Sequence, residues 1–235
     1  MSLEYDRRNL IAMGAAAIGA AGLHSMAASA QPAPLPAPGP YEVKPLPFDP
    51  STIPGLSERI IVSHHQNNYA GAVRRLNTIS QQLAQLDFST APNFVINGLK
   101  REELMAMNSM ILHELYFDSL GGGGAPTGLL ADAIARDFGS IARWHAEFSA
   151  MGKAQGGGSG WVLLSYSPRD GRLTNQWAAD HTTTLAGGRL VLALDMYEHA
   201  YHMDYGTGAA AYVDAFMDVV RWDNAGNLYQ RYVQG

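Results

Sequence analysis

A run of four glycines, Gly121–Gly124, divides this sequence of 235 residues into two parts with different patterns. Before the run, the segment from Glu58 to about Leu86 has no proline and carries apolar residues at helical intervals, which predicts one long helix. A second helix is predicted from Arg101 to Leu120, with one apolar face formed by Leu104, Met107, Ile111 and Leu115. Because consecutive glycines end a helix, we expect a helical hairpin that stops at the run, and a domain boundary there.

The part after the glycine run mixes helices and strands. Apolar spacing predicts helices at Leu129–Phe138 and Ser140–Met151 and a helical C-terminus from about Ala209. Between them lie three segments with the character of strands: Trp161–Ser167, Leu173–Ala179 and Arg189–Asp195. This order predicts an α+β fold. We expect an N-terminal helical-hairpin domain at residues 41–122, and a C-terminal domain at residues 123–235 with a three-stranded antiparallel sheet flanked by helices.

The first 30 residues are expected to be an export signal and not part of the fold. Arg7 and Arg8 precede a short, mildly apolar run, and Ala28-Ser29-Ala30 suits cleavage, which together resemble a twin-arginine signal. The alternative is a chance arginine pair before a membrane anchor rich in alanine and glycine. Residues 31–40 are rich in proline and predict an extended linker. We therefore expect a periplasmic or otherwise exported protein with no stable membrane association after signal removal.

Charge and cysteine content limit the chemistry that the chain can carry out. Its net charge of -5 argues against nucleic acid as a partner, because nucleic-acid binding needs basic surfaces. The sequence contains no cysteine, which excludes disulfides, thiolate metal sites and cysteine nucleophiles. Any bound metal must therefore be held by histidine, aspartate, glutamate or backbone oxygen.

The end of the third strand carries a group of residues that suits metal binding. Asp195 ends an apolar segment, and His199 follows four residues later, so both side chains can turn toward one point. Asp195 and Glu198 need a cation or hydrogen-bond partners if they are buried. His64 and His113, on the two predicted helices, could complete a site of three histidines and one carboxylate. Ligands of this kind suit iron or manganese and do not distinguish between the two.

Five segments in this order resemble the iron/manganese superoxide dismutase family. The sequence DMYEHAY at Asp195–Tyr201 is similar to the family signature, with Tyr197 where the signature usually has tryptophan. The resemblance covers nearly all of residues 41–235. Four further segments carry it. The first three are YEVKPLPFDP, SHHQNNYAGAVRRLN and HELYFDSL, and the fourth is a stretch of loop, helix and strand that contains GGGGAPTGLLADAIARDFGS and GGGSGWVLL.

The resemblance implies a reaction, a cofactor and partners. One iron or manganese ion per subunit would be held by the four residues named above, with water or hydroxide as a fifth ligand. The reaction would be the disproportionation of superoxide, a small anion, to oxygen and hydrogen peroxide. The protein would form a homodimer or a dimer of dimers. Dimer contacts are expected from Glu198, which would reach the last ligand histidine of the other subunit.

Three further residues are candidates for catalysis. His181 stands where the family has glutamine or histidine bonded to the metal-bound solvent, and Trp161 matches a tryptophan that lines the pocket. Tyr116, three residues after His113, is the third candidate.

The chain departs from the family around the substrate channel. Ala72 replaces a gate tyrosine eight residues after His64, and Asn68 replaces a histidine. His202 replaces a tyrosine, so the usual contact between subunits would become Asn68 with His202. Tyr197 and Phe117 replace tryptophans. These changes leave two alternatives open, namely a metal protein of the same fold with peroxidase-like or oxidase-like chemistry, and one with little dismutase activity.

Overall fold

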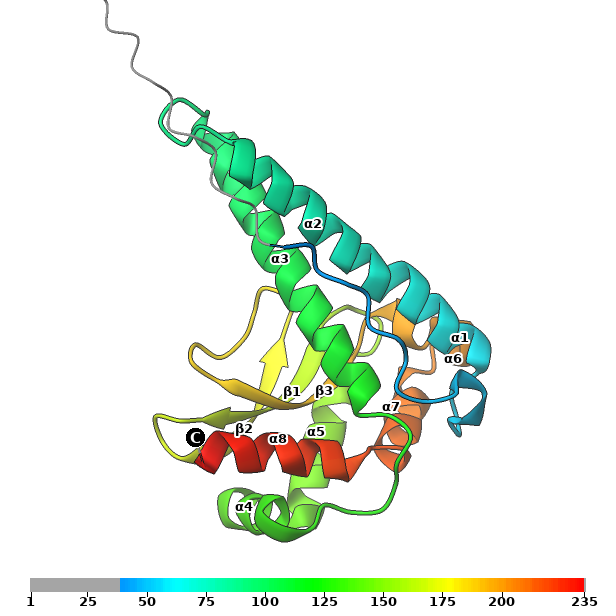
Figure 1. Ribbon diagram of the computed structural model, residues 1–235. Coiled ribbons are helices and arrows are strands. Elements are labelled where there is room, and N and C mark those ends of the chain that lie inside the picture. The colour runs from blue at the N-terminus through cyan, green and yellow to red at the C-terminus, as the bar shows by residue number, and fades with distance from the viewer. Residues whose placement is uncertain (1–38, 235) are drawn as a thin grey trace, which may run out of the picture. The chain divides into compact units, whose positions relative to one another are not determined.

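The computed structural model describes residues 39–234. The predicted export signal at residues 1–30 and most of the predicted linker at residues 31–40 lie outside the described residues. Within them, a pair of long helices is followed by shorter helices, three strands and further helices, which confirms the predicted α+β fold (Figure 1). No helix of this described part is both long and apolar enough to cross a membrane.

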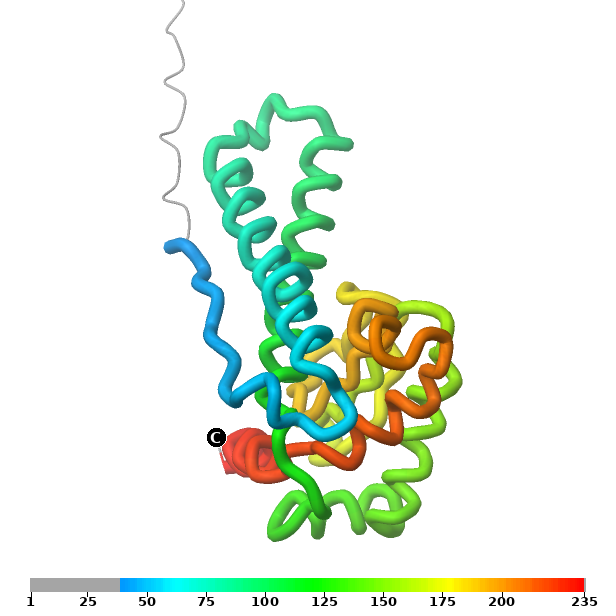
Figure 2. The backbone as a smooth tube through the Cα atoms, turned by 90° about the vertical axis from the view of Figure 1, so that its right-hand side faces the viewer, coloured from blue at the N-terminus to red at the C-terminus, as the bar shows by residue number. Residues whose placement is uncertain are grey.

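A helical hairpin forms the N-terminal part of the described chain. Its first arm is continuous through α1 (Glu58–Ser63), the π-helical segment η2 (His64–Tyr69) and α2 (Ala70–Gln85). Its second arm, α3 (Asn93–Asp118), runs back along α2 (Figures 1 and 2). The first arm begins where predicted, because the Ser57 hydroxyl caps it by accepting from the Ile60 amide.

The predicted apolar face of α3 is wrong in part. Leu104 and Ile111 are 48% and 41% exposed. The buried side of the helix instead includes Ser109 and His113, together with Ala106, Met110, Leu112, Leu115, Tyr116 and Phe117. Of the four residues of the predicted face, Leu115 alone is among these buried residues. The helix also begins at Asn93 rather than at the predicted Arg101, directly after Pro92.

The three strands form one antiparallel sheet in the order β2-β1-β3. Their bounds are β1 Trp161–Ser167, β2 Arg172–Ala178 and β3 Arg189–Asp195. In the turn between β1 and β2, the Gly171 amide donates to the Ser167 carbonyl at 2.9 Å, and Gly171 has a positive φ of 65°. The register pairs Trp161 with Asp195, so the first residue of β1 lies opposite the last residue of β3.

Helices surround the sheet, and three short helical segments were not predicted. The longer helices are α4 Gly128–Phe138, α5 Ile141–Ala154, α7 Ala209–Asp218 and α8 Trp222–Gln234. The short ones are η1 Pro50–Thr52, η3 Glu198–Ala200 and α6 His202–Tyr205. The predicted boundary at Gly121–Gly124 falls in the loop between α3 and α4, and the division into two domains stays a prediction.

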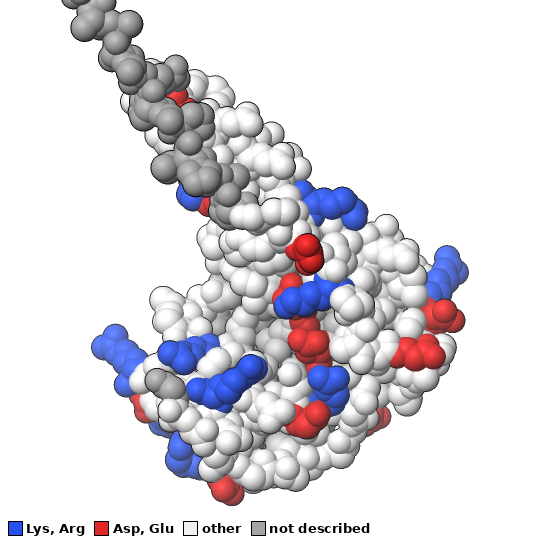
Figure 3. Space-filling view, in the orientation of Figure 1, with Lys and Arg blue, Asp and Glu red and all other residues white. Residues whose placement is uncertain are grey.

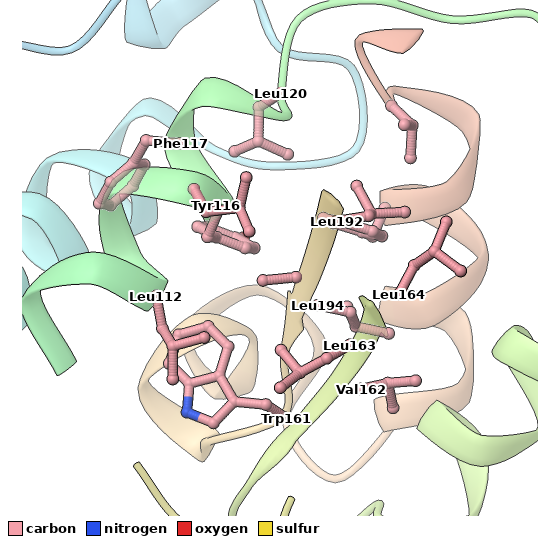
Figure 4. Packing of buried hydrophobic residues seen from close by; sticks show 14 of the residues in the cluster. Leu112, Tyr116, Phe117, Leu120, Trp161, Val162, Leu163, Leu164, Leu192 and Leu194 are labelled. Carbon is pink, nitrogen blue, oxygen red and sulfur yellow. The ribbon is translucent and has the colours of Figure 1, made fainter. Parts of the chain in front are cut away.

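The core joins the C-terminal half of α3 to the sheet. Figure 4 shows Leu112 and Tyr116 of α3, and Leu120 two residues after its end, near Leu192 and Leu194 of β3. All five side chains are buried. Burial of this kind stabilises the fold by about 1.5–3 kcal/mol for each large apolar side chain. On the face shown in Figure 3, acidic and basic side chains alternate down the middle, and several basic side chains gather at the lower left.

Candidate metal centre

Four side chains from four elements meet at one point. His64 is the first residue of η2, His113 lies on α3, Asp195 ends β3 and His199 lies in η3. One potential ligand atom from each lies within 4.8 Å of the others. His64, His113 and Asp195 are buried, whereas the side chain of His199 is 26% exposed. The structure thus brings together the four residues that the sequence nominated as metal ligands.

Local structure explains how the chain delivers these residues. The π-helical turn begins at His64, and such turns are frequent at functional sites. The sheet ladder ends at Asp195, and the short η3 turn then returns His199 toward the strand end. The start of the first helix is tied to this C-terminal region, because the Ser57 amide and hydroxyl both donate to the Asp204 carboxylate at 2.7 Å.

One carboxylate oxygen lies at the middle of the group. Asp195 Oδ2 is 3.1 Å from His64 Nε2, 3.2 Å from His199 Nε2 and 3.6 Å from His113 Nε2. The other oxygen, Oδ1, accepts a hydrogen bond from the Tyr197 amide at 2.8 Å. This contact fixes the carboxylate plane, so that Oδ2 faces the three imidazoles.

His113 shows that these residues fit a metal ion. Its Nδ1 donates to the Ser109 carbonyl at 2.7 Å, because a carbonyl oxygen only accepts. Nε2 is therefore left with a free lone pair, and among the described residues it is a buried nitrogen without a hydrogen-bond partner. A buried polar atom without a partner is costly, and a cation bound by this lone pair would remove that cost. An unprotonated imidazole nitrogen is also the form that binds metals.

The protonation states agree with this assignment. Burial lowers the pKa of His113 to about 3 and also lowers the pKa of His64, so both rings are neutral. Burial acts to raise the pKa of Asp195, but the interactions with His199 and His64 outweigh it and hold that pKa well below its usual range. Three imidazoles and one carboxylate, without sulfur, form a donor set that suits iron or manganese.

His181 and Trp161 lie beside the four ligands. Trp161 Nε1 donates to His181 Nδ1 at 3.0 Å, and an indole nitrogen can only donate. His181 Nδ1 is therefore the acceptor, and the ring proton lies on Nε2. The ring centroid of His181 is 5.9 Å from that of His113. The structure thus places a neutral histidine with a known donor nitrogen next to the group.

Tyr197 has a larger part in the site than its sequence position suggested. Its ring stacks on His181 at 4.8 Å and on His199 at 5.3 Å, with interplanar angles of 15° and 17°. It therefore links the ligand His199 to His181. From the sequence, Tyr197 was noted only as a departure from the family signature. Its position within that signature, between Asp195 and His199, was the one feature that could have indicated a role in the site.

Tyr116 lies against the buried side of the site. Its ring is 5.1 Å from the His64 ring, and its hydroxyl is 3.3 Å from that of Tyr212. The Tyr212 hydroxyl donates to the Asp195 carbonyl at 2.8 Å. Burial raises the pKa of both phenols above the usual range, so both stay protonated. Sequence analysis missed Tyr212, because nothing in its local pattern on α7 connects it with Asp195.

The residues expected at the subunit contact and the gate lie farther out. Glu198 and His202 are exposed, and Asn68 is partly buried. Within the described part of the chain, the side chains of Glu198 and His202 make no hydrogen bond. Ala72 is a buried residue of α2.

Known proteins resemble this chain over most of its length. Residues 126–228 match the C-terminal domain of iron/manganese superoxide dismutases. The chain is 66% identical over 194 residues to an iron superoxide dismutase of Cupriavidus metallidurans, an alignment that covers 83% of this chain and 98% of the relative. It is 36% identical over 195 residues to manganese superoxide dismutase 1 of Halobacterium salinarum, with 81% and 96% covered. It is 31% identical over 201 residues to an iron superoxide dismutase of Pyrobaculum aerophilum, with 83% and 94% covered.

Proposed function

The chain belongs to the iron/manganese superoxide dismutase family and is a superoxide dismutase, and we propose that it works with one iron ion held by His64, His113, Asp195 and His199. The observation that carries the proposal is the convergence of these four ligand atoms within 4.8 Å, with a buried and unpartnered His113 Nε2 among them. Iron is chosen over manganese because the relative with 66% identity is an iron enzyme, whereas the similarity to the manganese enzyme of Halobacterium salinarum is 36%.

The bound metal would supply the redox chemistry, by accepting an electron from one superoxide and giving it to the next. The chain's own residues have other tasks. Asp195 contributes the negative charge of the ligand set, with its orientation fixed by the Tyr197 amide. His181 holds a proton on Nε2, from which it can donate a hydrogen bond toward the centre. Tyr116 and Tyr212 support the Asp195 backbone from the buried side.

The active form of the protein is proposed to be a homodimer. Glu198 lies next to the ligand His199, is exposed and makes no side-chain hydrogen bond within the described residues. A hydrogen bond from the partner's copy of that histidine would give this carboxylate a partner and orient the ligand ring. Asn68 and His202 would meet across the same interface.

The protein is further proposed to be exported through the twin-arginine route, which carries folded proteins. Support comes from Arg7, Arg8 and the small-residue sequence Ala28-Ser29-Ala30. Replacing both arginines with lysine should leave the protein in the cytoplasm of a bacterial host with a twin-arginine system. Cell fractionation measures this, and equal periplasmic amounts of the two forms would contradict the proposal.

A dismutase assay on iron-loaded protein, with elemental analysis of the same sample, tests the function. We expect about one iron per chain and rapid loss of superoxide. A peroxidase assay on the same sample tests the alternative that Ala72 opens the channel to other substrates. Full iron content together with peroxidase activity and no dismutase activity would contradict the proposed reaction.

A further inference from the structure

A second group of polar side chains lies behind the metal centre, on the N-terminal segment and the two ligand helices. Lys44, Tyr69 and Glu114 form it, and we call these three residues the brace. The Tyr69 hydroxyl accepts from the Lys44 amide at 2.9 Å and donates to Glu114 Oε1 at 3.0 Å. The Lys44 ammonium pairs with Glu114 Oε2. One phenol therefore joins three separate segments of the chain.

The brace lies directly beside two ligands. Glu114 follows His113 on α3, and Tyr69 is the last residue of the π-helical segment that begins with His64. His65, which follows His64 in η2, is tied to the same N-terminal segment, because its Nε2 donates to the Lys44 carbonyl at 2.8 Å. The Phe117 ring fills the space between, 5.1 Å from His64 and 6.3 Å from Tyr69. The contacts of the brace thus act on the two elements that carry His64 and His113.

The three residues of the brace contribute unequally to its stability. The Lys44 side chain is 66% exposed, so its ion pair with Glu114 contributes little. Tyr69 is 1% exposed, and burial raises its pKa to about 12, so its hydroxyl remains a donor. A buried donor that loses its acceptor carries the full cost of its desolvation. The hydrogen bond between Tyr69 and Glu114 is therefore the important contact.

We infer that Glu114 and Tyr69 are positioning residues for the metal centre, which hold η2 and α3 at the separation that lets His64 and His113 bind one ion. The inference rests on the proposed function, because it concerns the same ion. Neither residue touches the ligand atoms, and both act through the helices that carry the ligands.

The test compares Glu114→Ala and Tyr69→Phe with the wild type, all loaded with iron. Both variants should lose iron to a chelator about 10-fold faster, as is typical when residues that support metal ligands are changed. Their ferric electron paramagnetic resonance spectra should also differ from that of the wild type, since the spectrum reports ligand arrangement. A small cavity of about 20 Å³ beside Lys44 and Glu114 can admit one water, so the alanine variant is expected to fold. Circular dichroism checks this.

Two conservative variants and one matched control complete the design. Glu114→Gln keeps an acceptor for Tyr69, and Lys44→Met removes only the exposed charge, so both should retain iron like the wild type. The control is Glu102→Ala, which removes an ion pair between Arg75 of α2 and Glu102 of α3 on the same hairpin.

The outcomes separate this inference from the proposed function. Faster iron loss and altered spectra in Glu114→Ala and Tyr69→Phe, with Glu102→Ala unchanged, would support the positioning role. Equal iron retention in all variants, or equal loss in the control, would overturn it while the proposed function stands. A wild type that takes up no metal would overturn both.

Discussion

Single hydrogen bonds determine which ring nitrogen carries the proton in two histidines of the metal centre. The Ser109 carbonyl binds the proton on His113 Nδ1, and the Trp161 indole donates to His181 Nδ1. The first contact leaves Nε2 of His113 as a lone pair, and the second leaves Nε2 of His181 as a donor. These two histidines thereby offer different groups, a lone pair that suits a cation on His113 and a hydrogen-bond donor on His181.

A prediction about His181 follows from this difference. The His181→Ala variant should keep its metal, because the ring is not one of the four converging ligands. Its reduction potential should shift and its turnover fall by about 10-fold or more, since a donor beside the centre is lost. Protein-film voltammetry and a dismutase assay measure both. Loss of the metal itself would show instead that His181 is a ligand.

The four ligand candidates could be named from sequence, whereas the residues that support them could not. Asp195 and His199 belong to a local signature, and His64 and His113 lie in recognisable helix sequences. The hydrogen bonds from Tyr212 to Asp195 and from Tyr69 to Glu114 join segments that are far apart in the sequence. No local pattern encodes such contacts.

At the scale of elements, strands with a regular apolar pattern were predicted well, whereas irregular helical turns were not predicted. The bounds of β1 and β3 agree with prediction to the residue, because short apolar segments between turn residues have few other solutions. The π-helical turn at η2 and the short segments η3 and α6 were not predicted. They carry or adjoin the candidate ligands, and their geometry depends on packing against distant segments rather than on the intrinsic preference of their residues.

The contact between α4 and β2 gives a prediction at this scale. Asp137 is buried, and its carboxylate accepts from the Leu173 amide at 2.7 Å and from Arg136 Nε at 2.8 Å. Burial acts to raise the pKa of Asp137, but the hydrogen bonds from Arg136 and Leu173 outweigh it and lower that pKa below 3.8. The Asp137→Asn variant should therefore lose about 2 kcal/mol of stability at pH 7.

The pH dependence of this loss has a definite sign. Because the folded-state pKa is lowered, the carboxylate contributes its stability above about pH 4 and loses it as the pH falls through the folded-state value. The difference in unfolding free energy between wild type and Asp137→Asn should shrink as the pH falls below 4. Urea unfolding of both proteins at pH 7 and pH 3 measures it. A difference that is equal at the two pH values would contradict the assignment.

At the scale of the whole molecule, one chain leaves part of the site open. The side chain of His199 is 26% exposed, and Glu198 and His202 beside it are exposed as well. Most of the ligand group is buried within the chain, so the open side is the place where a second subunit would complete it. The proposed dimer thus accounts for an exposed acid next to a metal ligand.

The dimer prediction is tested by Glu198→Ala. We expect this variant to dissociate more readily and to lose metal at the same time, because one contact would serve both. Sedimentation at micromolar concentration, with metal content measured on the same sample, tests the coupling. Glu42→Ala, which removes another exposed acid of the described chain, is the control. A Glu198→Ala protein with an unchanged dimer and unchanged metal would remove Glu198 from the site.

The metal content of the Asp195→Ala variant shows whether the four converging residues bind the metal. Asp195 Oδ2 is the atom around which the three histidine nitrogens gather, and its pKa is held well below the usual range, so that it carries a negative charge in this site. Wild-type protein should contain about one iron per chain, and folded Asp195→Ala should contain almost none. A folded Asp195→Ala protein that keeps its full iron content would contradict the account.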